Sequence, residues 1–278
     1  MKKIIKRIIN FILRQSDVLL NNYMDSLLFS ERFQDSKRLL KYEYTVFAHC
    51  GEDGIIHEIF NRIGVSNSVF VEFGGHDGSF NNSTNLLLND WSGLWIEADP
   101  KMVERAKTTF KRYVDSNNLK IEQNFVTVEN IENIFKKNEI PVDFDFLSID
   151  IDFYDYYVWE AIKSYSPRMI IIEYNASLGP HNALVVPYKK NIGWEKTSYF
   201  GASLKALEIL GTKKGYSLVA CDPSGSNAFF VRSDLIKDNF HPPFSAEHHY
   251  EPPRYFLTYK KNGHKRKIGE YINIKNKT

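Results

Sequence analysis

The sequence is poor in cysteine, with only Cys50 and Cys221 among 278 residues. The two lie far apart and form no Cys-x-x-Cys pair and no cysteine–histidine ladder, which excludes a disulfide framework and a structural zinc site. A chain that needs no disulfide suits a reducing compartment, and we expect a cytoplasmic protein.

The sequence also has no long apolar run and no large excess of charge of one sign. The first 33 residues are rich in isoleucine, but basic residues interrupt them too often for a membrane span or a secretory signal. These basic residues are Lys2, Lys3, Lys6, Arg7 and Arg14. The net charge of the chain is only +2, and no nucleic-acid-binding motif occurs, so a nucleic-acid partner is not expected.

Residues 1–41 are expected to form an amphipathic helical segment. Its isoleucines recur at helical spacing, and its basic residues fall on the opposite face. Three interpretations stay open: a helix packed on the domain or on another copy of the chain, an interfacial contact of residues 1–33 with a membrane, or a frayed terminus. The second interpretation would place the protein at the inner membrane face.

The stretch that organises the chain is residues 69–78, Val-Phe-Val-Glu-Phe-Gly-Gly-His-Asp-Gly. An apolar strand that ends in glycines leaves backbone N–H groups bare at the carboxyl edge of a sheet, where a nucleotide-like ligand can approach. Glu72 puts negative charge where a pyrophosphate would sit, and therefore favours a cationic ligand. The alternative is a plain turn in which Glu72 caps a helix.

Apolar strands and amphipathic helices alternate after this stretch. Further strands are predicted at residues 93–96, 119–126, 144–151, 169–172, 216–221 and 227–232, and helices at 81–89, 100–117, 131–137, 156–162 and 203–214. Together with a helix before residue 64, this pattern predicts a seven-stranded, mostly parallel α/β sheet with helices on both faces. The short Pro-Ser-Gly connection at residues 223–225 requires the last strand pair to be antiparallel.

Polar residues close several of these strands. Glu97 follows the glycines by about twenty residues, the distance at which Rossmann-type folds place an acid on a ribose diol. Asp150 and Asp152 end the fourth strand, and Glu173 and Asn175 end the fifth, so strand alternation puts each pair on one side. Such oxygen ligands suit Mg²⁺ or Mn²⁺. The alternative is that Asp150 contacts a cofactor, Asp152 caps a helix and Glu173 binds backbone.

Histidines provide candidates for a general base. His181 lies in the loop just beyond Asn175 and is the best single candidate, although an incidental loop histidine is an equal alternative. His76 lies inside the glycine turn, where it either reaches the reacting region or stabilises the turn. His248 and His249 could reach over the site from a C-terminal lid.

The order of these motifs resembles class I S-adenosylmethionine-dependent methyltransferases, and within them the FkbM-type group, over residues 42–235. The motifs that carry the resemblance are Gly-Glu-Asp-Gly-Ile-Ile at 51–56, Val-Glu-Phe-Gly-Gly-His-Asp-Gly at 71–78, Gly-Leu-Trp-Ile-Glu at 93–97, Leu-Ser-Ile-Asp-Ile-Asp at 147–152 and Ile-Glu-Tyr-Asn at 172–175. The resemblance implies a Rossmann-like class I methyltransferase fold and an S-adenosylmethionine site. One departure is that Phe153 follows Asp152, where FkbM-type enzymes usually have a carboxylate and a glycine.

The resemblance also implies roles for individual residues. Glu72, Gly74 and Gly78 would border the methionine part of the cofactor, Glu97 would hold the ribose hydroxyls, and residues 124–126 would flank the adenine. The full set of expected cofactor-binding residues is Glu72, Gly74, Gly75, His76, Gly78, Glu97, Ala98, Asn124, Phe125 and Asp150.

These observations predict a methyltransferase domain at residues 42–240, followed by a basic extension at 241–278. The expected activity is O-methylation of a small polar acceptor, a sugar or sugar-nucleotide precursor of a bacterial surface polysaccharide, with Asp150 and His181 as catalytic candidates. One alternative is an NAD-dependent oxidoreductase, whose Tyr-x-x-x-Lys pair occurs only at Tyr271 and Lys275. The other is a binding module for S-adenosylmethionine without turnover.

Overall fold

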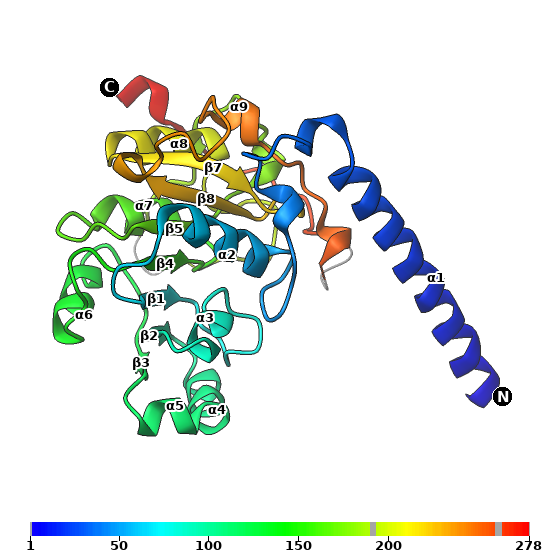
Figure 1. Ribbon diagram of the computed structural model, residues 1–278, viewed down its shortest axis with the longest axis horizontal. Helices are drawn as coiled ribbons and strands as arrows, with labels where there is room; N and C mark the ends of the chain where they lie inside the picture. The colour runs from blue at the N-terminus through cyan, green and yellow to red at the C-terminus, as the bar shows by residue number, and fades with distance from the viewer. Residues whose placement is uncertain (1, 190–192, 259–262, 278) are drawn as a thin grey trace.

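The computed structural model describes residues 2–189, 193–258 and 263–277, with side chains from residue 15 to residue 275. A seven-stranded sheet forms its centre (Figure 1). The strands are β1 Val69–Phe73, β2 Ser92–Glu97, β3 Leu119–Gln123, β4 Phe146–Ile149, β5 Met169–Glu173, β7 Tyr216–Cys221 and β8 Asn227–Arg232.

The spatial order of the sheet is β3-β2-β1-β4-β5-β8-β7. Neighbouring strands among β1 to β5 are parallel, whereas β8 is antiparallel to both β5 and β7. This strand order and this single reversed strand are those of the Rossmann-like class I methyltransferase fold. The fold predicted from the sequence is therefore confirmed.

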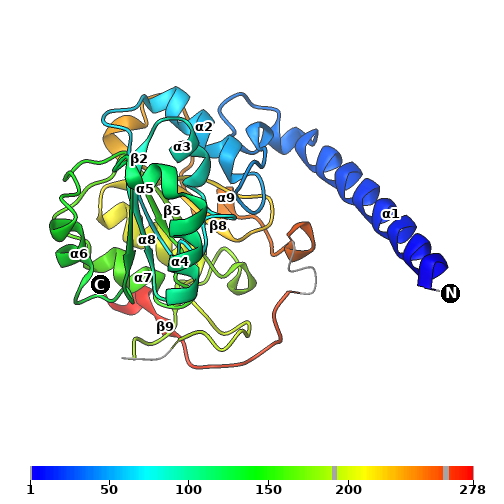
Figure 2. The same ribbon diagram turned by 90° about the horizontal axis from the view of Figure 1, so that it is seen from below.

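Helices cover both faces of the sheet, as Figures 1 and 2 show. Strand alternation explains this arrangement, because Val71 and Phe73 of β1 enter one apolar core while Phe70 enters the other. The first core contains α6 Ile131–Lys137, α7 Asp155–Ala161 and α8 Leu204–Lys213; the second contains α2 Glu52–Ile63, α3 Thr84–Leu88, α4 Pro100–Thr109 and α5 Lys111–Asp115.

Two local predictions differ from the structure. The helix predicted at 100–117 is broken at Phe110, which leaves helical geometry at φ −102° and ψ 23° and packs edge-on against Trp95 with ring centroids 4.8 Å apart. A small second sheet, β6 Leu184–Val185 with β9 Ile272–Asn273, was not predicted. Strands of two residues are too short to show an alternating pattern.

The helix α1, Lys2–Leu28, projects away from the body (Figures 1 and 2). Near its base, Tyr23 accepts a hydrogen bond from Arg254 at 2.9 Å and packs edge-on against Phe256. Farther out, Leu19 is 69% exposed. The prediction of an apolar face on the first half of α1 concerns side chains that lie outside the described ones. Among the described residues, no helix is both long and apolar enough to span a membrane.

Packing crosses both of the predicted domain boundaries. Leu39 and Leu40 are buried in the same core as α2, and Ala246, the first residue of α9 Ala246–His249, joins the core of α8. Arg32 also forms an ion pair with the buried Glu251 at 2.9 Å. Residues 33–40 and much of the extension therefore stabilise the domain. In the predicted basic extension, Lys260 and Lys261 lie outside the described residues.

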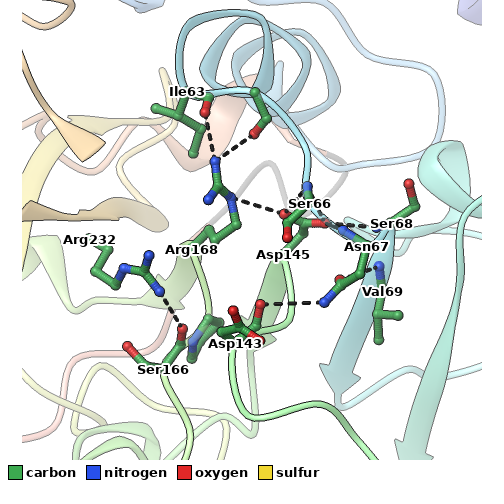
Figure 3. Close-up of polar contacts among 12 residues, drawn as sticks. Ile63, Ser66, Asn67, Ser68, Val69, Asp143, Asp145, Ser166, Arg168 and Arg232 are labelled. Atoms are coloured by element: carbon green, nitrogen blue, oxygen red, sulfur yellow. Dashed lines mark hydrogen bonds and ion pairs between the residues drawn. The ribbon is translucent and has the colours of Figure 1, made fainter. Parts of the chain in front are cut away.

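A buried carboxylate holds the amino-terminal edge of the sheet (Figure 3). Asp145, which immediately precedes β4, accepts hydrogen bonds of 2.7–3.0 Å from the backbone N–H groups of residues 66–68, just before β1. Its carboxylate also lies 3.1 Å from Nε of Arg168, just before β5. Arg168 in turn donates to the carbonyl of Ile63 at the end of α2. One side chain thus fixes the starts of three neighbouring strands.

We expect Asp145→Ala to lower the free energy of unfolding by about 3–5 kcal/mol, because it leaves a largely buried arginine and three N–H groups without their acceptor. Urea denaturation measures this change. The control is Asp143→Ala, which removes an exposed carboxylate two residues away and should change the free energy by less than about 0.5 kcal/mol. Equal stability of the two variants would contradict the expectation.

Candidate functional site

A cavity of about 1130 Å³ lies at the carboxyl ends of β1, β2 and β4. It is lined by the turn after β1 at Gly74 and His76, by Glu97 at the end of β2, and by Asp150 just after β4. From β1 the chain adds β2 and β3 on one side, and it then crosses to the other side of β1 to add β4 and β5, so the strand order switches between β1 and β4. Open α/β sheets bind their ligands at such a switch point.

Gly74 makes this arrangement possible. Its φ of +69° lies in the left-handed region, and a Cβ at this position would lie 1.9 Å from the carbonyl oxygen of Asp150. Gly78 also has a positive φ, and a Cβ at this position would lie 2.4 Å from the ring of Phe110. Gly78 and Gly75 are not among the described residues that line the cavity. Both glycines pack the turn, and their contact with a cofactor stays a prediction.

Glu72 lines the cavity but has a structural task as well. Its carboxylate accepts hydrogen bonds from the N–H of Asn82 at 2.9 Å, the N–H of Ser83 at 3.0 Å and the Ser83 hydroxyl. Burial raises the pKa of Glu72 to about 7, although these hydrogen bonds oppose the shift. The side chain therefore ties the end of the glycine turn to β1, and contact with the methionine part of a cofactor stays a prediction.

Glu97 is oriented by two backbone groups. One carboxylate oxygen accepts the N–H of His76 at 2.8 Å, and the other accepts the N–H of Asp99 at 2.7 Å. Each oxygen keeps a second lone pair, so the carboxylate can accept hydrogen bonds from two adjacent hydroxyl groups. Ala98, Asn124 and Phe125 line the cavity beside it. The ring of Phe125 is 57% exposed, which leaves a flat apolar surface for a ligand.

Three predicted metal ligands come together. Asp150, Asp152 and Glu173 each place a carboxylate oxygen so that these atoms lie within 4.8 Å of one another. Strand alternation does not explain this closeness, because Asp152 has a left-handed backbone with φ 66°. Burial, and then the charge of Asp150, raise the pKa of the neighbouring buried Asp155 well above its usual range.

Asn175, the fourth predicted ligand, has a structural role. It is fully buried, and its amide oxygen accepts the N–H of Ser177 in the short helix η3, Ala176–Leu178. Its amide nitrogen donates to the carbonyls of Ser198 and Phe200, both at 3.0 Å. All these bonds hold backbone, and the ligand role of Asn175 stays a prediction.

The histidines predicted as base or lid lie apart from the cavity. His181 is 77% exposed and has Nδ1 3.7 Å from the Glu247 carboxylate, and it is not one of the described lining residues. His248 instead contacts His241, with Nδ1 of His241 2.9 Å from its Nε2, and burial lowers its pKa to about 4. His249 is buried beside His248. The structure thus gives no support to His181 as the base.

Sequence reasoning missed a large part of the lining. Aromatic and basic residues complete the cavity: His49, Phe80, residues 153–154, Trp194, Lys196 and His264. The sequence signals were Phe153, the departure from the FkbM-type pattern, and the aromatic residues of the long loop, among them Trp194. Backbone strain marks the cavity too, because His76, Asp152 and Lys196 all have positive φ values, of 42°, 66° and 59°. Such strain persists where the surrounding structure enforces it, often at functional sites.

No protein-family model matches the chain, and no curated protein matches its sequence. One solved structure with a similar fold is magnesium protoporphyrin IX methyltransferase (ChlM) from Synechocystis PCC 6803 with bound SAM. Its sequence is 11% identical, the match covers 66% of this chain and 78% of that chain, and the TM-score is 0.42. A putative caffeoyl-CoA O-methyltransferase from Staphylococcus aureus has 17% identity, over 65% and 82% of the two chains, with a TM-score of 0.43. These likenesses concern the fold alone.

We expect Gly74→Ala to destabilise the protein by about 3 kcal/mol, because the new Cβ meets a backbone oxygen and the left-handed backbone disfavours alanine. Thermal unfolding should show a melting temperature lower by about 6–12 °C. Gly193→Ala is a matched control, since Gly193 lines the same cavity with an ordinary φ and nothing within 4 Å of an added Cβ. A similar loss in both variants would show that the close contact is unimportant.

Proposed function

We propose that the protein transfers a methyl group from S-adenosylmethionine to a hydroxyl group of a small polar acceptor. The observation that carries the proposal is one cavity, at the switch point of the sheet, that combines the Gly74 turn, the oriented carboxylate of Glu97 and the acidic edge at Asp150. S-adenosylmethionine supplies a methyl group on a cationic sulfur, and a negative edge favours such a ligand.

The lining also fits the other parts of this cofactor. Glu97 offers acceptors for the two ribose hydroxyls, and Asn124 and Phe125 offer an amide and a flat ring for the adenine. NAD fits less well, because its pyrophosphate would face the carboxylates of the same edge. The Tyr-x-x-x-Lys alternative also lacks support, since Tyr271 packs on Tyr199 and is not among the described lining residues.

The acceptor hydroxyl needs activation, because a neutral hydroxyl is a poor nucleophile. We propose that Asp150, Asp152 and Glu173 bind a divalent cation, Mg²⁺ or Mn²⁺, which supplies charge that stabilises an alkoxide. The convergence of the three carboxylates supports this role.

The proposed acceptor is a sugar or sugar-nucleotide precursor of a bacterial surface polysaccharide. The aromatic part of the lining supports a sugar or nucleotide, and the FkbM-type motifs support the pathway. Cytoplasmic location, peripheral membrane contact of residues 1–33 and self-association of the chain stay predictions.

Calorimetric titration with S-adenosylhomocysteine tests the cofactor class, with NAD as the comparison ligand. We expect binding of S-adenosylhomocysteine and none of NAD. Glu97→Ala should weaken the binding roughly 10- to 150-fold, because hydrogen bonds to a charged group contribute about 1.5–3 kcal/mol. Glu104→Ala, which removes an exposed carboxylate on α4, should leave the affinity unchanged. Binding of NAD alone would exclude the methyltransferase and favour the oxidoreductase.

Melting temperatures with and without Mg²⁺ or Mn²⁺ test the cation site, since a ligand that binds only the folded state stabilises it. We expect millimolar cation to stabilise the wild type and the Asp143→Asn control, but not Asp150→Asn. Asp150→Asn should still bind S-adenosylhomocysteine. If the cations stabilise all three proteins equally, or none of them, Asp150 does not take part in a metal site.

A further inference from the structure

The acidic residues and Lys196 of the described cavity lining come from different segments of the chain. The acidic residues of the described lining, Glu72, Glu97, Asp150 and Asp152, belong to strand ends or to the residues just after them. A further group of lining residues, which we call the outer wall, comes from loops: His49, Phe80, Phe153, Tyr154, Gly193, Trp194, Lys196, Gly263 and His264. The members of this wall in the described lining are aromatic residues, basic residues and glycines, and none of them is acidic. The lining thus combines acidic residues at strand ends with aromatic and basic residues from loops, and the latter suit an anion.

The rings of the outer wall are held by their neighbours. His49 stacks on Phe80 with ring centroids 5.6 Å apart and an interplanar angle of 7°. Trp194 packs edge-on against His264 at 4.8 Å and donates its indole N–H to the carbonyl of Thr197 at 2.7 Å. Rings fixed in this way present flat faces on which a nucleobase can stack at little cost in conformational entropy.

Lys196 adds a positive charge to this wall. Its backbone is left-handed, its side chain is exposed, and its amine forms no ion pair or hydrogen bond with any part of the chain that the structure describes. The adjacent acid, Glu195, is already neutralised by an ion pair with Lys267. A bridge between Thr197 and Lys265 joins the two segments, which brings a second exposed lysine to the same region. This local excess of positive charge suits phosphate groups.

The cavity volume leaves room for a second ligand beside the cofactor. Pockets for one drug-sized molecule usually measure about 300–1,000 Å³, and this cavity exceeds that range. We infer that the outer wall binds a nucleoside diphosphate, with its base on the aromatic rings and its diphosphate at Lys196. The acceptor is then a nucleotide-linked sugar, whose hydroxyl points toward the acidic edge. This inference rests on the proposed function and narrows its substrate class.

Calorimetry on the full chain saturated with S-adenosylhomocysteine tests the inference. The probes are UDP, dTDP and GDP, compared with uridine, which lacks the charge, and with inorganic pyrophosphate, which lacks the base. We expect at least one nucleoside diphosphate to bind at least tenfold more tightly than either comparison compound. Lys196→Gln should weaken that binding at least tenfold and change S-adenosylhomocysteine affinity less than twofold. Lys213→Gln, an exposed lysine on α8 outside the described lining, is the control.

Each contrary result has a distinct meaning. Pyrophosphate binding as tight as that of the nucleotides would overturn the assignment of a base site. Nucleotide binding that Lys196→Gln leaves unchanged would overturn the role of Lys196. Binding of S-adenosylhomocysteine without any nucleotide binding would overturn the inference and leave the proposed function standing. Nucleotide binding that depends on Lys196, measured on protein that does not bind S-adenosylhomocysteine, would support the outer wall and reject the methyltransferase.

Discussion

The site depends on the close approach of two backbones, the turn after β1 and the chain after β4. A side chain at Gly74 would collide with the carbonyl oxygen of Asp150, so this approach requires glycine. The same turn brings the N–H of His76 to Glu97, which fixes that carboxylate at the end of β2. The missing Cβ of Gly74 therefore allows the ends of β1, β2 and β4 to lie close together. This arrangement brings Glu97 and Asp150 to the same cavity.

Buried carboxylates serve this fold mainly as acceptors for exposed loop backbone. Asp145 accepts the N–H groups of residues 66–68, and Asp53 accepts those of residues 46–48. Asp222 does the same for residues 224 and 226, between β7 and β8, and for Asn227 at the start of β8. Charge-assisted hydrogen bonds of this kind offset the cost of burying the carboxylate. The protein thus holds its loops with local acids, whereas Asp150 and Asp152 face a cavity.

The strands could be predicted from the sequence because their signals are local. Apolar alternation and glycine turns predicted the seven strands of the main sheet. Glu97 lines the cavity, as its distance from the glycines in the sequence predicted. The surroundings of His181 and Asn175 could not be predicted, because loop geometry after β5 turns His181 outward and buries Asn175. The meeting of residues 193–196 with residues 263–264 could not be predicted, since it depends on long-range contacts.

The projecting helix α1 also affects how the molecule moves through solution. Its 27 residues correspond to a rod of about 40 Å, attached to the body near Tyr23. Such a rod increases frictional drag far more than it increases mass. A single chain of 32.4 kDa would then leave a gel-filtration column early, as a larger compact particle does. The elution volume would overstate the number of subunits, so light scattering or sedimentation equilibrium is the appropriate measure of assembly.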